Sequence, residues 1–168
     1  MEIRQISEIN SAQAQQLAQI LLDAVNDGAS VGFLKPFSLS DAASYWLKVN
    51  LALNDKHRLW IVLENDLIIA TVQLILSSSI NAWHRAQVVK LLVASDCRGR
   101  QISSKLMAEL EKVACELGVS LLLLDTQSGS TAEHIYIHLG WQKVGEIPNY
   151  AKLPSGVLAA TSYFYKLI

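Results

Sequence analysis

One run of the sequence, from His84 to Thr126, constrains the fold more than any other. His84–Ala94 is rich in β-branched and apolar residues, a short polar loop Arg98–Arg100 follows, and apolar residues at helical spacing then mark a long helix that Gly118 ends. The next segment, SLLLLDT, is a continuous apolar run typical of a strand buried on both faces. This strand–helix–strand order predicts a right-handed parallel crossover in a core sheet.

The loop between that strand and the long helix has the composition of an anion-binding site. The first N–H groups of a helix have no intrahelical partner and lie at the positive end of the helix dipole, so the main chain alone can bind a phosphate there. Arg98 and Arg100 add two positive charges. An ordinary strand-to-helix turn with two solvated arginines has the same pattern, so spacing alone leaves both interpretations open.

The rest of the chain is predicted to be helical at its start and mostly strand-forming after Arg58. Apolar residues at helical spacing predict one helix over Ser11–Val25 and a second, capped by Ser40, that continues to Leu53. Three strands after Arg58 are expected to form a meander. The expected strands are Ile3–Ile6, Leu59–Glu64, Leu67–Leu76, His84–Ala94, Ser120–Thr126, Trp141–Glu146 and Ala160–Ile168, with a further helix over Thr131–Leu139. This order predicts an α+β fold, with a mixed, mostly antiparallel sheet of about seven strands and helices on both faces.

Composition limits the class of protein. A chain of 168 residues that is 51% hydrophobic and 17% charged can bury its own core, so we expect one domain over residues 1–168. The formal net charge of −1 argues against nucleic acid or an anionic membrane as partner. The polar N-terminus lacks an apolar leader and the hydrophobic runs are shorter than a membrane span, which predicts a cytoplasmic protein.

The sequence gives little support for metal or thiol chemistry. His134 and His138 are four residues apart on a predicted helix, but no third ligand accompanies them, so no metal is expected. Cys97 and Cys115 have no CxxC spacing, and a cytoplasmic chain keeps them reduced.

Together these segments resemble the GNAT superfamily of acetyl-CoA-dependent N-acetyltransferases. The resemblance rests on the strand, the loop RGRQIS, the long helix, the buried strand and the helical segment AEHIYIHLGW, and it covers nearly the whole chain. It implies a GNAT-like fold and acetyl-CoA as cosubstrate. The stretches GASVGF, RAQVVKLLV, LLLLDTQSGSTAE and VGEIPNYAKLPSGVL are also similar to the tabtoxin-resistance acetyltransferases of plant-pathogenic bacteria, a group within the superfamily.

In the family, the loop pattern is Gln or Arg, two residues, Gly, one residue, then Gly or Ala, and the loop holds the CoA pyrophosphate. Arg98 matches the first position, whereas Gln101 and Ser103 replace the small residues. Glycine is favoured where backbone must approach a ligand closely or take a positive φ, so Gln101 either weakens cofactor binding or shifts the loop path. The resemblance assigns cofactor contacts to Leu91, Val93, Arg98, Gly99, Arg100, Gln101, Ile102, Ser103 and Ser104.

The resemblance also points to two catalytic side chains. Tyr136 matches the tyrosine of the family's A-x-x-x-Y segment, whose phenol donates a proton to the departing CoA thiolate. Packing of the helix on the sheet explains the same aromatic residue without any chemistry. Asp125, at the end of the buried strand, is the best-placed general base, and a strand-end aspartate that bonds its own turn is the alternative. Gln87 stands where many family members carry a glutamate base, which leaves Asp125, a water relay or His84.

The acceptor pocket is expected between the first helical region and the late loop, where acidic groups can hold an ammonium and apolar walls surround the rest. The candidates are Asp27, Ser30, Phe33, Trp46, Glu146, Asn149 and Tyr150. The expected reaction is acetyl transfer to the amine of a small molecule, such as a toxin, an antibiotic or an amino-acid-like compound. A non-catalytic acyl-CoA-binding or regulatory module and an N-terminal peptide acetyltransferase are the alternatives. The apolar C-terminal strand is compatible with a homodimer.

Overall fold

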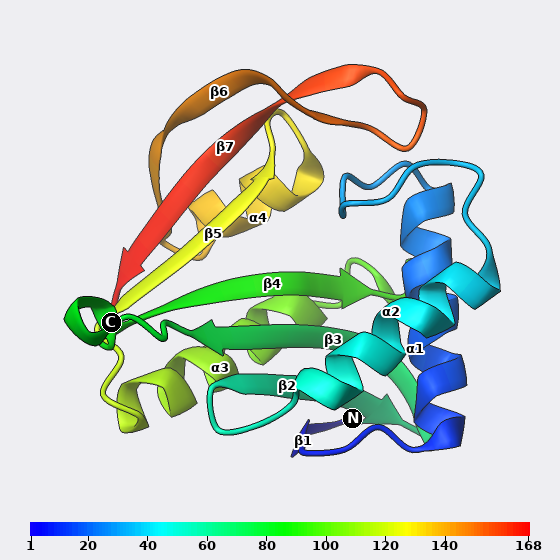
Figure 1. Ribbon diagram of the computed structural model, residues 1–168, viewed down its shortest axis with the longest axis horizontal. Helices are drawn as coiled ribbons and strands as arrows, with labels where there is room; N and C mark the ends of the chain where they lie inside the picture. Colours follow the sequence, from blue (N-terminus) through cyan, green and yellow to red (C-terminus); the bar gives the residue numbers. More distant parts are fainter.

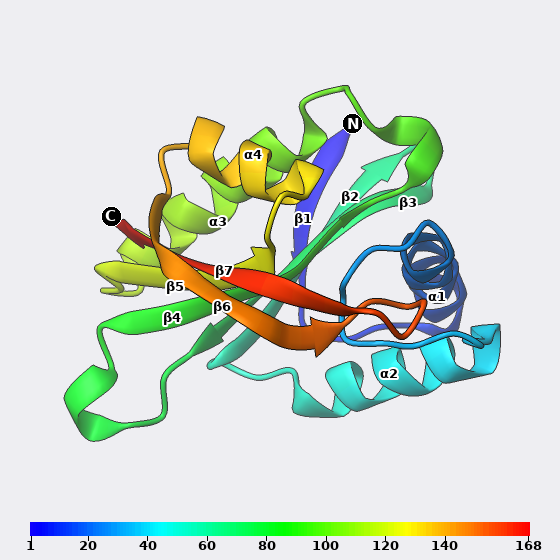
Figure 2. The ribbon, with the colours of Figure 1, turned by 90° about the horizontal axis from the view of Figure 1, so that it is seen from above.

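The computed structural model describes residues 1–168, which form a seven-stranded sheet with two helices on each face (Figures 1 and 2). The strands are β1 (Glu2–Ile6), β2 (His57–Glu64), β3 (Leu67–Leu76), β4 (Arg85–Val93), β5 (Leu121–Gln127), β6 (Gln142–Lys152) and β7 (Leu158–Leu167). The helices are α1 (Ser11–Asn26), α2 (Leu39–Ala52), α3 (Ile102–Glu116) and α4 (Thr131–His138). This confirms the predicted fold class.

The strands lie in the order β1-β2-β3-β4-β5-β7-β6, and only β4 and β5 are parallel. The meander of β2, β3 and β4 and the crossover through α3 are both as predicted from the sequence. β4 and β5 pair only between Arg85–Gln87 and Leu121–Leu123, after which the two strands diverge (Figure 1). The sheet is therefore split along its middle.

Two separate cores hold the helices to the sheet. α3 and α4 cover one face, where Leu106 and Leu110 of α3 are fully buried, and α1 and α2 cover the other face, where Leu17 and Trp46 are fully buried (Figure 2). Burying a side chain of this size contributes about 1.5–3 kcal/mol. None of the four helices combines the length and apolar character needed to cross a membrane.

Helix α2 begins two residues before the position expected from the sequence. Ser38, and not Ser40, is the N-cap, because Asp41 lies three residues after Ser38 and completes a capping box. Ser40 itself lies within the first turn of the helix. The cap fixes the end of the α1–α2 loop, which borders the cleft described below.

Strand β6 is longer than the predicted Trp141–Glu146. Pro148 and Asn149 have the composition of a turn, yet β6 continues to Lys152 because an irregularity between Ile147 and Ala151 accommodates them on the edge of the sheet. The residues that the sequence places in a late loop therefore lie on a strand.

Candidate active site

A cleft of about 660 Å³ opens where β4 and β5 separate. Its walls come from the two diverging strands, the N-terminal ends of α3 and α4, and the loop between α1 and α2. Because ladder pairing between the two strands ends at Gln87 and Leu123, their facing backbone groups no longer bond to each other beyond that point. Those groups can bond to a ligand instead.

A β-bulge in β4 lies at the point where the two strands separate. Lys90 has a φ of +53°, and the register with β3 changes between Val89 and Leu92 so that β4 contains one extra residue. The bulge breaks the alternation of side chains between the two faces of the sheet. Leu91 and Val93, the expected pantetheine contacts, both line the cleft.

The N-terminus of α3 lies at the other end of the cleft and has no side-chain cap, unlike α1, α2 and α4. Its first N–H groups are therefore available to an anion. Gln101, the N-cap residue, has a φ of +58°. Gln101 thus takes the left-handed conformation, which the glycine of the family pattern takes easily. For glutamine this conformation costs about 1–2 kcal/mol. The loop therefore keeps a backbone conformation typical of glycine at this position, although glutamine occupies it.

The two arginines of the loop have different surroundings. Arg98 lines the cleft and forms an ion pair with Asp27 at the end of α1, and this arginine holds the pKa of Asp27 below its ordinary value. Arg100 points away from the cleft and donates to both carboxylate oxygens of Glu64, at 2.7 and 3.0 Å. Only Arg98 is positioned beside a ligand in the cleft.

The remaining loop residues predicted to bind the cofactor are divided between the cleft and its surroundings. Ser103 lines the cleft, whereas the side chain of Ile102 is buried in the core, so only its backbone can contact a ligand. Gly99, Gln101 and Ser104 do not line the cleft. The N-terminal turn of α3 therefore presents uncapped backbone N–H groups, with Arg98 and Ser103 beside them in the cleft.

Tyr136 and Asp125, the predicted catalytic pair, both line the cleft. Tyr136 is 8% exposed and packs against Trp141 and Phe164, with ring centres 6.0 and 6.3 Å away. Its burial, together with the negative charge of Asp125, raises the pKa of Tyr136 well above its ordinary value of 10. The phenol therefore stays protonated at neutral pH. His84 immediately precedes β4, at the paired end of the two strands, and does not line the cleft.

The structure brings only some of the predicted acceptor residues to the cleft. Asp27, Ser30 and Tyr150 line it. Phe33 instead packs against Phe37 and Tyr45, with ring centres 4.6 and 5.5 Å away.

Three other predictions for the acceptor pocket are corrected. Trp46 is completely buried between α2 and the sheet and cannot line a pocket. Glu146 lies on β6, where it accepts a hydrogen bond from Lys143 at 3.2 Å, and Asn149 lies at the irregularity of that strand. Neither of these two residues lines the cleft.

The first turn of α4, which the sequence analysis did not assign to the site, also lines the cleft through Ser130 and Thr131. Glu133 holds this turn in place, because its carboxylate accepts hydrogen bonds from the backbone N–H of Gly129 and, at 2.8 Å, from the ammonium of Lys143. These two bonds lower the pKa of Glu133 from 4.5 to about 2. Glu133 thus positions a wall of the cleft and does not contact its contents.

Lys90 is another cleft residue that was not predicted from the sequence. It lines the cleft from the bulge in β4, and its Nζ lies 5.6 Å from the ring centre of Tyr45 and 6.0 Å from that of Phe33. The signal in the sequence was a single amine within the apolar run QVVKLLV.

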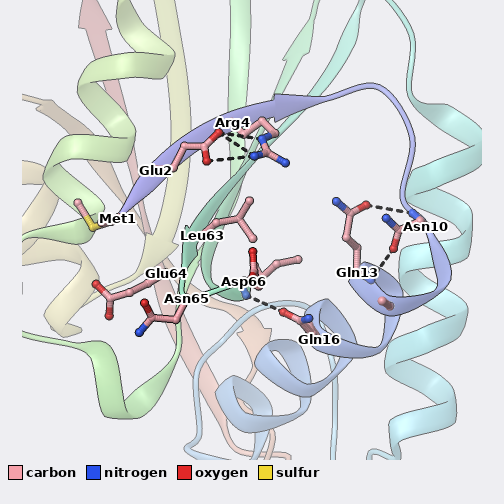
Figure 3. Close-up of a pocket in the computed structure, with 12 residues that line it drawn as sticks. Met1, Glu2, Arg4, Asn10, Gln13, Gln16, Leu63, Glu64, Asn65 and Asp66 are labelled. Atoms are coloured by element: carbon pink, nitrogen blue, oxygen red, sulfur yellow. Dashed lines mark hydrogen bonds and ion pairs between the residues drawn. The ribbon is translucent and has the colours of Figure 1, made fainter.

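A second hollow, of about 450 Å³, lies between β1, the start of α1 and the β2–β3 turn (Figure 3). Its polar side chains largely satisfy one another: Arg4 pairs with Glu2, Gln13 with the N-cap Asn10, and Gln16 with the backbone of Ile68. No three His, Cys, Asp or Glu side chains come together anywhere in the structure to hold a metal. The cleft between β4 and β5 is therefore the better candidate for an active site.

A sheet that splits between two parallel strands, with an uncapped helix terminus at one end of the split, is the arrangement found in acyltransferases of the GNAT type. A sequence model described as "Acetyltransferase (GNAT) domain" matches residues 55–143, which include β2 to β5, the α3 loop and Tyr136. The chain belongs to the GNAT acetyltransferase family.

Several solved structures have the same fold. The chain is similar to a ribosomal-protein-alanine N-acetyltransferase from Brucella melitensis, at 20% identity and a TM-score of 0.78 over 100% of both chains. It is similar to an N-acetyltransferase from Staphylococcus aureus Mu50, at 12% identity and a TM-score of 0.79 over 99% of both chains. An aminoglycoside 6'-N-acetyltransferase solved with coenzyme A matches at 18% identity and a TM-score of 0.75, over 99% of this chain and 97% of that one. At these identities the similarity establishes the fold.

Proposed function

We propose that this protein transfers the acetyl group of acetyl-CoA to the amine of a small molecule by direct attack, without an acyl-enzyme intermediate. The observation that carries the proposal is one continuous cleft, which joins the uncapped N-terminus of α3 to the free edge of β4 and to Tyr136 and Asp125. An anion site, a row of free backbone groups and an acid–base pair are the parts that this reaction needs.

In this proposal the CoA pyrophosphate binds the first N–H groups of α3, with Arg98 and Ser103 beside it. Arg98 is already in the cleft, and its partner Asp27 is exposed, so the exchange of that carboxylate for a phosphate keeps the guanidinium paired. Pantetheine lies along β4, where it takes the place of the missing β5 partner and bonds to the backbone of Leu91 and Val93. A backbone N–H of this edge polarises the acetyl carbonyl and stabilises the oxyanion that develops on it.

Asp125 takes a proton from the acceptor ammonium, directly or through a water molecule. The neutral amine nitrogen attacks the carbonyl carbon, the carbon–sulfur bond breaks, and Tyr136 donates its proton to the departing thiolate. The nitrogen then releases its second proton to solvent, which leaves the neutral amide, and solvent returns a proton to the Tyr136 phenolate. Burial of the phenol supports this role, because it keeps Tyr136 protonated up to high pH.

A small acceptor is favoured by the loops around the acceptor end of the cleft. The α1–α2 loop is bonded to the β6–β7 turn, where the N–H of Lys35 donates to the carbonyl of Pro154 at 2.9 Å. These segments lie close to each other in both views (Figures 1 and 2). Two loops that are bonded to each other in this way leave more room for a compact amine than for an extended peptide. The sequence likeness to tabtoxin-resistance acetyltransferases supports a toxin or an amino-acid-like compound as acceptor.

The test is release of free CoA thiol from acetyl-CoA across amines, amino acids, β-lactam toxins, aminoglycosides and peptides. The proposal expects turnover with at least one small amine and loss of that turnover in Tyr136→Phe. Absence of calorimetric acetyl-CoA binding would contradict the enzyme proposal. Binding without turnover of any amine would favour a non-catalytic acyl-CoA-binding module, and turnover of peptides alone would favour an N-terminal peptide acetyltransferase.

A further inference from the structure

Two charged side chains of the cleft form no direct ion pair. Four charged residues line the cleft, and two of them, Asp27 and Arg98, pair with each other. Lys90 and Asp125 form no ion pair and no side-chain hydrogen bond with any residue. The acceptor end of the cleft thus carries one free positive and one free negative charge.

The ammonium of Lys90 lies in a partly desolvated position over aromatic rings. Tyr45 and Phe33 face it, and a Cβ placed on Gly32 would lie 3.9 Å from its Nζ, so the α1–α2 loop passes directly beside it. Burial lowers the pKa of Lys90, and the negative charge of Asp125 partly opposes this effect. Desolvating a lysine ammonium without a direct ion pair costs free energy, and a negatively charged ligand would offset that cost.

The aromatic surface under Lys90 is held rigidly from behind. The amide of Gln73, which is completely buried on β3, donates from Nε2 to the hydroxyl of Tyr45 at 3.0 Å. The ring Nε2 of His57 lies 2.8 Å from Oε1 of the same glutamine. This chain of bonds fixes the ring of Tyr45, and with it the place of the lysine, before any ligand arrives.

Lys90 and Asp125 lie on the same side of the sheet. Leu122 and Leu124 pack into the core under α3, so the alternation along β5 places Asp125 on the opposite face. Lys90 reaches that same face, the one covered by α1 and α2, because the bulge in β4 directs its side chain there. A ligand between the diverging strands therefore meets both charges.

We propose that Lys90 binds an acidic group of the acceptor, so that the acceptor is a zwitterion: an amine that also carries a carboxylate. The inference rests on the proposed acetyltransferase function and narrows its substrate class. The carboxylate pairs with Lys90 while the amine faces Asp125 and the acetyl carbonyl. The aromatic rings contact the Lys90 ammonium but do not neutralise its positive charge, and the substrate carboxylate does so.

The test compares amino acids with their own carboxamides, which keep the amine and lose the negative charge. We expect the wild-type protein to prefer the acid in kcat/KM by about 10-fold or more, because a bond between two charged groups adds that much binding. Lys90→Met should abolish this preference, mainly through a higher KM for the acid, and Lys90→Arg should restore part of it. Lys112→Met, at an exposed lysine on α3, serves as the matched control.

Three results would overturn the inference. Equal losses for acid and carboxamide in Lys90→Met, with melting temperature and acetyl-CoA affinity unchanged, would show that Lys90 does not recognise the charge. Acetylation of Lys90, detected by mass spectrometry after incubation with acetyl-CoA, would show that Lys90 is itself an acetyl acceptor and not a binding residue for the substrate carboxylate. Absence of turnover with every amine would refute the proposed function itself, and this inference with it.

Discussion

Replacing Tyr136 by phenylalanine removes one oxygen atom from the wall of the cleft and leaves the ring in place. The ring keeps its contacts with Trp141 and Phe164, and the hydroxyl bonds to no protein group, so the folded state loses little. We expect the free energy of unfolding to change by less than about 1 kcal/mol, which for a chain of this size shifts Tm by less than about 4 °C. A positioned general acid contributes about 10²- to 10⁴-fold to the rate, which corresponds to about 3–5 kcal/mol of transition-state stabilisation. The change should therefore lower kcat strongly without unfolding the protein.

The assay follows CoA thiol release at saturating acetyl-CoA with an accepted amine, from pH 6 to pH 9. Tyr136→Phe should lower kcat by about 100-fold or more and leave the KM for acetyl-CoA within about 2-fold. Tyr165→Phe is the matched control, because Tyr165 lies on β7 outside the cleft and bonds to Gln142. The pKa of Tyr136 is raised above 10, so its ionisation should cause no loss of wild-type rate in this pH range. A Tyr136→Phe protein that keeps more than half of the wild-type kcat throughout would refute the proton-donor role.

Three further changes test other parts of the site. Arg98→Ala should weaken acetyl-CoA binding by about 10-fold in calorimetry, because a charge beside the pyrophosphate is lost, whereas Arg100→Ala, whose guanidinium is bound to Glu64, should have a smaller effect. Gln101→Gly should raise Tm by about 1–2 °C, since relief of left-handed strain outweighs the greater entropy of glycine in the unfolded chain. Gln101→Val should lower Tm by about 3 °C or more. Glu133→Gln should cost about 2 kcal/mol in thermal unfolding at pH 7, because a buried carboxylate loses its bond to an ammonium. The depressed pKa of Glu133 gives stability that is present above its ordinary pKa of 4.5 and is lost as the pH falls towards 2, so the difference from Glu133→Gln should disappear on acidification.

Each of these predictions has a result that would contradict it. Equal effects of Arg98→Ala and Arg100→Ala on acetyl-CoA affinity would mean that the orientation of the two arginines is not used in binding. A lower Tm for Gln101→Gly than for the wild type would mean that the left-handed backbone stores no strain. A stability difference for Glu133→Gln that persists at pH 2 would locate its effect in packing and not in charge.

Much of the fold could be predicted because the signals are local. The apolar run of β5, the helical spacing of α3 and the β-branched strands β2 and β3 each have their own period, and their order restricts the topology. The errors have physical causes too. Ser38 and Ser40 are equally good caps in isolation, and only the reciprocal bond with Asp41 selects the first. Pro148 and Asn149 carry turn chemistry, but an edge strand can accommodate it.

The site was harder to predict because it depends on contacts between distant segments. Tyr136 and Asp125 are predicted from a motif and a strand end, and both line the cleft. Lys90 was not predicted because it lies in a β-bulge, where side chains no longer alternate between the two faces of the sheet. The bulge depends on how β4 pairs with β3, and the sequence of β4 alone does not show that pairing. Glu146 was wrongly assigned to the acceptor pocket. Its hydrogen bond from Lys143 depends on the conformation of β6, which the sequence does not reveal.

Direct acetyl transfer is tested most sharply with acetyl-CoA labelled in the acetyl group, mixed rapidly with an excess of the protein and an accepted amine and then quenched. The direct mechanism predicts that the label passes in a single turnover from CoA to the amide product, that none is bound to the protein at any time, and that no CoA is released when the amine is left out. Label bound covalently to the protein before product forms, or no transfer to any amine, would contradict it.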